Sequence, residues 1–178
     1  MPYLPMTEYE TADEAMRARY DAQIAAHGRI TNMKRTLLHN LRAFDVYMEW
    51  YPMADALKEF LTARAVSLYA YAISEGNRCL VCGTFFRKIL VDAGDDPDNP
   101  LLSDEERLLM DLGFSIAEDP HNIDPGIYAA LQERYATEQI VQLFAFAGIM
   151  AATNLFNTIA KVDLDEVLYE YRRTKPFE

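Results

Sequence analysis

The chain has 178 residues, of which 51% are hydrophobic and 25% charged, the composition of a globular protein and not of a disordered one. This length favours one domain with a core of its own. Lys and Arg number 17 against 28 Asp and Glu, and the net charge of −11 argues against binding to nucleic acid or anionic membrane. Two cysteines are too few for a secreted disulfide framework, and the N-terminus lacks the features of a signal peptide, so we expect a cytoplasmic protein.

Helix-capping signals run through the sequence, whereas hairpin signals such as Asn-Gly are absent. Capping-box spacings occur at Thr11-x-x-Glu14, Ser103-x-x-Glu106 and Asp163-x-x-Glu166, and Asp124 precedes Pro125 as an N-cap precedes a first-turn proline. The pattern predicts an all-α protein. Its helices are expected over residues 11–27, 33–50, 52–62, 63–75, 79–93, 103–117, 124–135, 138–161 and 163–173.

One irregular stretch, residues 92–102, divides the predicted helices. We expect a single domain over 1–178, with a core that holds the cysteines over about 33–93 and a C-terminal helical half over about 103–173. The acidity of this loop is typical of a solvated segment. A cation site is the alternative, built from four carboxylates, although the calcium-loop spacing is absent; they are Asp92, Asp95, Asp96 and Asp98.

The segment from Gln139 to Ala160 carries no formal charge over 22 residues, a length that could cross a bilayer. Polar side chains such as Asn154 and Asn157 interrupt it, and no Lys or Arg distinguishes its two flanks. We therefore predict a buried helix rather than a membrane span. A helix that is apolar on most sides needs partners all round, and in a chain this short another subunit would supply some of them.

The residues that could carry chemistry are the only two cysteines, Cys79 and Cys82. On a helix this spacing places both sulfurs on one face, within reach of a disulfide if the first turn relaxes. Gly76 and Asn77 indicate that one helix ends and another begins just before the pair. A helix N-terminus stabilises a thiolate, which makes a cysteine nucleophilic at neutral pH.

Other interpretations of the cysteine pair must be weighed. A c-type haem site requires a histidine directly after the second cysteine, where Gly83 stands. A zinc site requires four ligands, and the histidines are scattered at His27, His39 and His121. We therefore expect neither a cofactor nor a metal. Two small buried hydrophobic side chains would also account for the pair, so a redox function and a packing function both stay open.

The segment Ser74–Cys82 resembles the Ser-x-x-Asn-x-Cys-x-x-Cys segment of the AhpD-like alkylhydroperoxidases, in the carboxymuconolactone decarboxylase superfamily. Residues 27–32 are similar to the Gly-x-x-x-Asn segment before that family's second helix. Residues 138–160, with Asn154, are similar to the long C-terminal helix of its peroxidase-related members. The resemblance covers about 27–165 and implies an all-α, oligomeric AhpD-like helical bundle.

In family members with peroxidase activity, the second cysteine attacks the peroxide and the first resolves it as a disulfide. The resemblance thus assigns these roles to Cys82 and Cys79. Those members also use a proton relay, with a glutamate and a histidine where this sequence has Ser67 and Phe86. Loss of such acid–base help typically costs about 10²–10⁴-fold in rate. We expect Phe86, Ser67 and Tyr71 to line the pocket.

Glu75 could replace the missing base only if its helix continued through Gly76 and Asn77, which those two residues argue against. The first hypothesis is an antioxidant thiol oxidoreductase, which reduces a hydroperoxide or a disulfide and is recycled by an unidentified thiol reductant. The second is an oligomeric binding or scaffold protein that has kept the fold and lost the chemistry. The third is an enzyme acting on an acidic lactone, which should have an arginine or histidine directed into its pocket.

Overall fold

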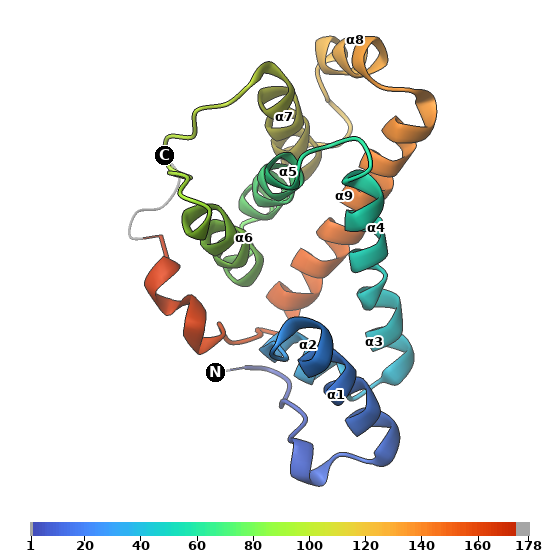
Figure 1. Ribbon diagram of the computed structural model, residues 1–178, viewed down its shortest axis with the longest axis vertical. Helices are drawn as coiled ribbons and strands as arrows, with labels where there is room; N and C mark the ends of the chain where they lie inside the picture. Colours follow the sequence, from blue (N-terminus) through green and yellow to red (C-terminus); the bar gives the residue numbers. More distant parts are fainter. Residues whose placement is uncertain (1, 174–178) are drawn as a thin grey trace.

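The computed structural model describes residues 2–173 and contains, over that range, α-helices and 3-10 helices but no strand (Figure 1). The α-helices are α1 (Glu14–His27), α2 (Asn32–Leu37), α3 (Leu41–Met48), α4 (Trp50–Leu57), α5 (Ala63–Gly76), α6 (Leu80–Asp92), α7 (Asp104–Glu118), α8 (Pro125–Arg134) and α9 (Thr137–Ile159). The 3-10 helices are η1 (Tyr9–Thr11) and η2 (Glu166–Tyr171). The predicted all-α class is confirmed. The ends of the predicted domain, residue 1 and residues 174–178, lie outside the described residues.

Two of the predicted helix starts are confirmed by their hydrogen bonds. Ser103 accepts a hydrogen bond of 3.3 Å from the Glu106 N–H, and the Glu106 side chain accepts one of 2.9 Å from the Ser103 N–H, which completes a capping box. Asp124 caps α8 by accepting from the Gly126 N–H at 2.7 Å, with Pro125 as the first helical residue.

Other boundaries were predicted wrongly, because polar side chains cap helices at unexpected places. The predicted helix 33–50 is broken at Asn40, whose side chain accepts from the Ala43 N–H at 3.0 Å and begins α3. The first helix begins after Asp13, which bonds the Met16 N–H at 2.8 Å, and not after Thr11. The segment predicted as a helix over 163–173 contains the 3-10 helix η2.

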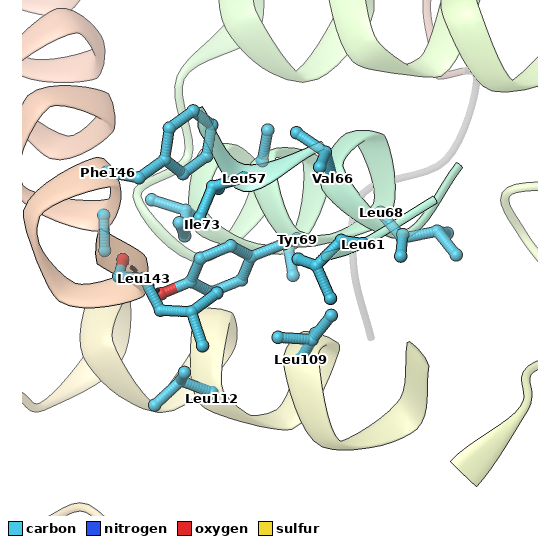
Figure 2. Close-up of a cluster of buried hydrophobic side chains, with 14 of the residues drawn as sticks. Leu57, Leu61, Val66, Leu68, Tyr69, Ile73, Leu109, Leu112, Leu143 and Phe146 are labelled. Atoms are coloured by element: carbon cyan, nitrogen blue, oxygen red, sulfur yellow. Dashed lines mark hydrogen bonds between the residues drawn. The ribbon is translucent and has the colours of Figure 1, made fainter. Parts of the chain in front are cut away.

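Helix α5 lies in the middle of the bundle and is contacted by α6, α7 and α9 (Figure 1). Its Tyr69 is completely buried among Leu109 and Leu112 of α7 and Phe146 of α9 (Figure 2). The Tyr69 hydroxyl donates a hydrogen bond of 3.1 Å to the Leu143 carbonyl, so this buried polar group is satisfied. The aromatic ring therefore joins three helices in one core.

Helices α5 and α7 pack closely because glycines stand at their contacts. A Cβ atom on Gly113 would lie 2.9 Å from the Ala72 Cβ and 3.1 Å from the Tyr69 carbonyl oxygen. A Cβ atom on Gly76 would lie 2.7 Å from the Ala117 Cβ. The distances of 2.9 Å and 2.7 Å are shorter than real Cβ contacts, so a larger residue at either position would force the helices apart. The close approach holds the C-terminal end of α5, and with it the start of the cysteine segment, against α7.

The acidic loop between α6 and α7 is held by ion pairs. Arg64 of α5 bonds Asp95 at 2.9 Å and also pairs with Glu106 of α7. Arg87 pairs with Asp98 at 2.5 Å. These contacts neutralise carboxylates that could otherwise have held a cation. Within residues 2–173, no group of three or more His, Cys, Asp or Glu side chains is arranged to hold a metal ion.

Helix α9 is the one described helix that is long and apolar enough to cross a membrane, and 33% of its most apolar stretch is buried. One face packs against α4, α5 and α6. The opposite face is exposed, although the sequence predicted a helix buried on most sides. We call this exposed face the apolar stripe; it consists of Val141, Phe144, Ala145, Gly148, Ala152, Leu155 and Ile159.

Candidate functional site

The site is built on the turn that joins α5 to α6. Arg78 has a positive φ of 55°, and the Arg78 N–H donates to the Glu75 carbonyl at 2.9 Å. The Cys79 N–H donates to the Ser74 carbonyl at 3.0 Å. These two bonds and the left-handed residue form a Schellman motif, which ends α5. The predicted break after Gly76 and Asn77 is thereby confirmed, and the chain reverses at Cys79.

Cys79 is the N-cap of α6. Its Sγ accepts a hydrogen bond of 3.5 Å from the Cys82 N–H. A hydrogen bond from the Cys82 side chain lowers the pKa of the Cys79 thiol, and bonds from the Cys82 and Val81 N–H groups and from Thr158 lower it further. Unpaired N–H groups at a helix start stabilise an anion. Of the two sulfurs, Cys79 is therefore the one on which a negative charge is more stable.

Cys82 lies one turn into α6 and receives a hydrogen bond from α9. The Asn157 Nδ2 atom donates to the Cys82 Sγ at 3.1 Å. The hydrogen bond to Cys79, together with burial, raises the pKa of the Cys82 thiol, while the bond from Asn157 acts in the opposite direction. Cys82 therefore loses its proton less readily than Cys79 does.

Both thiols are covered by the C-terminal segment. Cys79 is 3% exposed and Cys82 is 6% exposed, and both are free cysteines. Leu164 and the fully buried Leu168 of η2 pack on them together with Val81. Figure 1 shows η2 lying along α6. A reaction partner too large for the internal cavity could reach the sulfurs only after η2 moves.

A cavity of about 90 Å³ opens beside Cys82. Cys82 is in its wall, whereas Cys79 is not among the residues that line it. Most of the lining is apolar and comes from α2, α3, α4, α6, α9 and η2: Met33, Met48, Trp50, Val81, Phe85, Phe86, Met150 and Leu168. The polar lining includes Asn157, Lys34 and Asp165. A small molecule in this cavity would meet the Cys82 sulfur.

The structure places the expected pocket residues in two environments. Phe86 is buried and lines the cavity beside Cys82. Ser67 and Tyr71 are not among the lining residues. The Ser67 hydroxyl donates to the Ala63 carbonyl of its own helix at 2.9 Å, and Tyr71 is buried in the core of the bundle. Ser67 and Phe86 therefore supply no acid or base to Cys82.

Glu75 does not replace the missing base. Its helix ends at Gly76, and its carboxylate lies over the first turn of α6, where a Cβ on Gly83 would overlap with Oε1 of Glu75. Burial raises the pKa of Glu75, and a 3.4 Å contact with Arg173 opposes that shift. Glu75 is not among the residues that line the cavity.

A second hollow adjoins the cavity and shares four lining residues with it: Thr31, Lys34, Tyr51 and Phe85. Basic and aromatic groups predominate around this hollow, which we call the mouth. Its further lining residues are His27, Arg29, Lys88, Ile89 and Asp92. The chain has a net charge of −11, yet cations gather beside the cysteine cavity. Their local electrostatic potential favours an anion there.

Sequence reasoning missed the two polar residues that complete the site. In the sequence, Asn157 indicates only that a polar residue interrupts an apolar helix, and Lys34 has no predicted role. Lys34 is 4% exposed and bonds Gln23 and the Tyr51 hydroxyl, the latter at 2.6 Å. No sequence signal marks Lys34, because lysines are rarely buried and the burial of this one depends on how α2 packs.

Comparisons with known proteins identify solved structures that share this fold. No protein-family model and no curated protein sequence matches the chain. Among solved structures it is similar to an uncharacterized peroxidase-related protein of Ralstonia eutropha JMP134, described as an alkylhydroperoxidase AhpD core, with 18% identity, a TM-score of 0.74 and coverage of 98% of both chains. A second similar structure is a peroxidase-related protein of Silicibacter sp. TM1040, with 14% identity, a TM-score of 0.79 and coverage of 95% of this chain and 94% of that one.

A third similar structure is the debrominase Bmp8 in its apo form, with 16% identity, a TM-score of 0.76 and coverage of 93% of this chain and 94% of the other. These likenesses extend over almost the whole chain. They confirm the AhpD-like fold that the sequence resemblance predicted.

Proposed function

We propose that the protein is a thiol oxidoreductase that reduces a hydroperoxide through Cys82 and Cys79. The observation that carries the proposal is the division of the pair: Cys82 faces a small apolar cavity, while Cys79 lies behind it at a helix N-terminus and is hydrogen-bonded to it. Similarity to peroxidase-related proteins supports the same assignment. A small disulfide that fits the cavity would undergo exchange at the same sulfur.

Cys79 replaces the missing base in this scheme. The Cys79 thiolate accepts the proton of Cys82, and the Cys82 thiolate attacks the distal oxygen of the hydroperoxide. The O–O bond breaks, an S–O bond forms, and the alkoxide takes a proton from solvent. The Cys79 thiol then attacks the Cys82 sulfenic acid, which gives the disulfide and water. Two thiols and one hydroperoxide thus yield a disulfide, an alcohol and water.

Asn157 is suited to position the peroxide. Its Nδ2 atom stabilises the Cys82 thiolate through the 3.1 Å hydrogen bond. Within residues 2–173, its buried Oδ1 atom has no hydrogen-bond partner. A hydroperoxide O–H group is a donor that would satisfy this acceptor beside the attacking sulfur. Asn157 would therefore hold the reacting oxygen and the nucleophile together.

We also propose that the protein acts in the cytoplasm as a homo-oligomer and is recycled by a thiol reductant. A second copy of the chain is the occupant we assign to the apolar stripe. Its central positions are small, at Ala145, Gly148 and Ala152, and no heavy atom lies within 4 Å of a Cβ built on Gly148. Small residues let two helices approach closely, and the larger Val141 and Ile159 at the ends add apolar area.

Titration of native thiols with and without one equivalent of cumene hydroperoxide, followed by mass spectrometry, tests the proposal. Both thiols should disappear together, with a Cys79–Cys82 disulfide as the product. In Cys79→Ser, a sulfenic acid should accumulate on Cys82 and be trapped by dimedone. In Cys82→Ser, Cys79 should stay reduced, because it does not line the cavity.

The opposite result would favour the binding or scaffold protein. If the thiols react only after unfolding, the two cysteines have a packing role at the start of α6. Their burial under Leu164 and Leu168 would then serve stability and not catalysis. Oxidation of Cys79 in the Cys82→Ser variant would instead reverse the assigned roles. One of the similar structures is a debrominase, so the helical bundle alone does not determine which reaction a protein of this fold catalyses.

A further inference from the structure

Two cations at the mouth, Arg29 and Lys34, lack an ion-pair partner within residues 2–173, unlike several arginines elsewhere in the protein. Arg19, Arg64 and Arg87 each bond a carboxylate at 3.1 Å or less. Lys34, by contrast, is buried against neutral groups, with its ammonium bonded to Gln23 and Tyr51. Burial without a contacting carboxylate is costly for an ammonium group.

Arg29 increases this cost. It lies in the wall of the mouth, and within residues 2–173 it has no ion-pair partner. Burial lowers the pKa of Lys34 to about 8, and the positive charge of Arg29 is the next largest cause. Lys34 lies at the junction of the two hollows and Arg29 lies in the wall of the mouth, and together these two cations form an electrostatic site for an anion.

The carboxylates nearby do not cancel this field. Asp92 is paired with Lys88, so these two mouth residues neutralise each other. Asp165 lines the inner cavity and accepts a hydrogen bond of 2.9 Å from the Asn32 N–H. Its single charge faces two cations, Arg29 and Lys34, which leaves one net positive charge.

The inner cavity has the opposite character. Trp50, Met150 and Phe86 are among its apolar lining residues, and they surround the approach to Cys82. A ligand that occupied both hollows would need an apolar body for the cavity and a charged group for the mouth. Lys34 and Tyr51 line both hollows, so the charged group would lie next to them.

We propose that the site binds small amphipathic carboxylates, with the carboxylate between Arg29 and Lys34 and the apolar body beside Cys82. The inference rests on the proposed function only in naming the substrate class: a hydroperoxide that carries a carboxylate. Binding of the anion itself requires neither thiol. Arg29 and His27 at the mouth would equally suit an acidic lactone. They therefore indicate that the ligand is an anion, but they do not indicate which reaction it undergoes.

The chain has one tryptophan, Trp50, and it lines the cavity, so its fluorescence reports occupancy directly. Titration with hexanoate and with 1-hexanol compares two ligands with similar apolar bodies and different charge. Hexanoate should bind at least tenfold more tightly to the wild-type protein. Arg29→Gln and Lys34→Met should reduce that preference to about twofold or less, while Lys34→Arg should retain most of it.

Two surface variants control for the loss of a positive charge. Arg107→Gln and Lys58→Met each remove an exposed cation that does not line either hollow, and both should keep the wild-type preference. Circular dichroism verifies that each variant is folded. Equal affinities of the wild-type protein for hexanoate and 1-hexanol would overturn the proposal, as would an unchanged preference in Arg29→Gln.

Two assays on the wild-type protein, binding of hexanoate and oxidation of the thiols by cumene hydroperoxide, separate this proposal from the redox one. If hexanoate binds and the thiols are inert, the anion site stands and the oxidoreductase fails. If cumene hydroperoxide oxidises the pair but hexanoate does not bind, the oxidoreductase stands and the anion site fails.

Discussion

The Asn157 side chain of α9 donates a hydrogen bond of 3.1 Å to the Cys82 Sγ of α6. This contact joins the long apolar helix to the cysteine segment at the wall of the cavity. Thr158, the next residue, contributes to the lowered pKa of Cys79. The C-terminal end of α9 therefore influences both sulfurs, Cys82 through a hydrogen bond and Cys79 through its pKa.

Replacement of Asn157 by Leu should slow the oxidation of Cys82 by about tenfold or more. A hydrogen bond to a charged group contributes about 1.5–3 kcal/mol, and its loss would raise the pKa of a thiol that burial already disfavours as a thiolate. The measurement is the rate of sulfenic acid formation under single-turnover conditions, as a function of pH.

The matched control is Asn99→Leu, which makes the same change on the exposed surface of the loop. It should oxidise at the wild-type rate. A rate for Asn157→Leu within twofold of wild type at every pH would show that the hydrogen bond does not assist the nucleophile.

Lys34→Met should stabilise the protein at pH 7 by about 1–2 kcal/mol while it removes the anion site. The fall in the pKa of Lys34 from 10.5 to about 8 corresponds to roughly 3 kcal/mol, at 1.36 kcal/mol per pKa unit, and part is offset by the lost bonds to Gln23 and Tyr51. A stabilising substitution at a functional cation is a common trade-off. Urea unfolding measures the difference.

The pH dependence of stability has a definite sign. Between pH 8 and 10.5 the unfolded chain binds the Lys34 proton and the native protein does not, so wild-type stability gains a rising contribution across this window. Arg29 lowers the pKa of Lys34 further, and Asp165 opposes it. Lys34→Met should lack this rise, and Lys58→Met, altered at the surface, should retain it. If the stabilities of the wild type and Lys34→Met change equally between pH 8 and 10.5, Lys34 is not the group responsible for the rise.

The turn that presents the cysteines could be predicted because its signals are local. Gly76 and Asn77 end one helix, and the spacing of Cys79 and Cys82 fits the first turn of the next. Neighbours in sequence decide such a turn, so the sequence contains the information needed.

The residues that surround the two cysteines could not be predicted, because their positions depend on how the helices pack. Asn157 is 75 residues from Cys82, and its position in an apolar helix does not indicate which polar side chain faces α6. Lys34 meets the cavity because α2 is a separate short helix, divided from α3 by the cap at Asn40. The sequence pattern was continuous through Asn40, so one long helix was the natural prediction.

The ion pairs of Arg64 should anchor the acidic loop between α6 and α7. Arg64→Met leaves Glu106 buried without its cation and frees Asp95, so the expected loss of stability is about 1–3 kcal/mol. Burial alone would raise the pKa of Glu106, but bonds from Arg64 and Ser103 hold it below its usual range. The resulting stability is present at neutral pH and is lost as the pH falls through that lowered pKa.

Urea unfolding at several pH values tests this anchor. The variant should lose less stability than the wild type on acidification, because the contribution from Glu106 is already absent. Arg107→Met, an exposed arginine on α7, should behave as wild type at every pH. If Arg64→Met and Arg107→Met unfold at the same urea concentration, the ion pairs contribute nothing to holding the loop.

The protein should no longer form an oligomer when a charged residue is placed in the apolar stripe of α9. Leu155 is 60% exposed, so Leu155→Glu leaves the bundle core intact but would bury a carboxylate between two copies, which is unfavourable. Light scattering after gel filtration should give a multiple of the 20.4 kDa protomer mass for the wild type and a single protomer for the variant. Leu101→Glu, 92% exposed in the loop, should remain oligomeric. A wild-type mass of one protomer would exclude the stripe as a self-association surface.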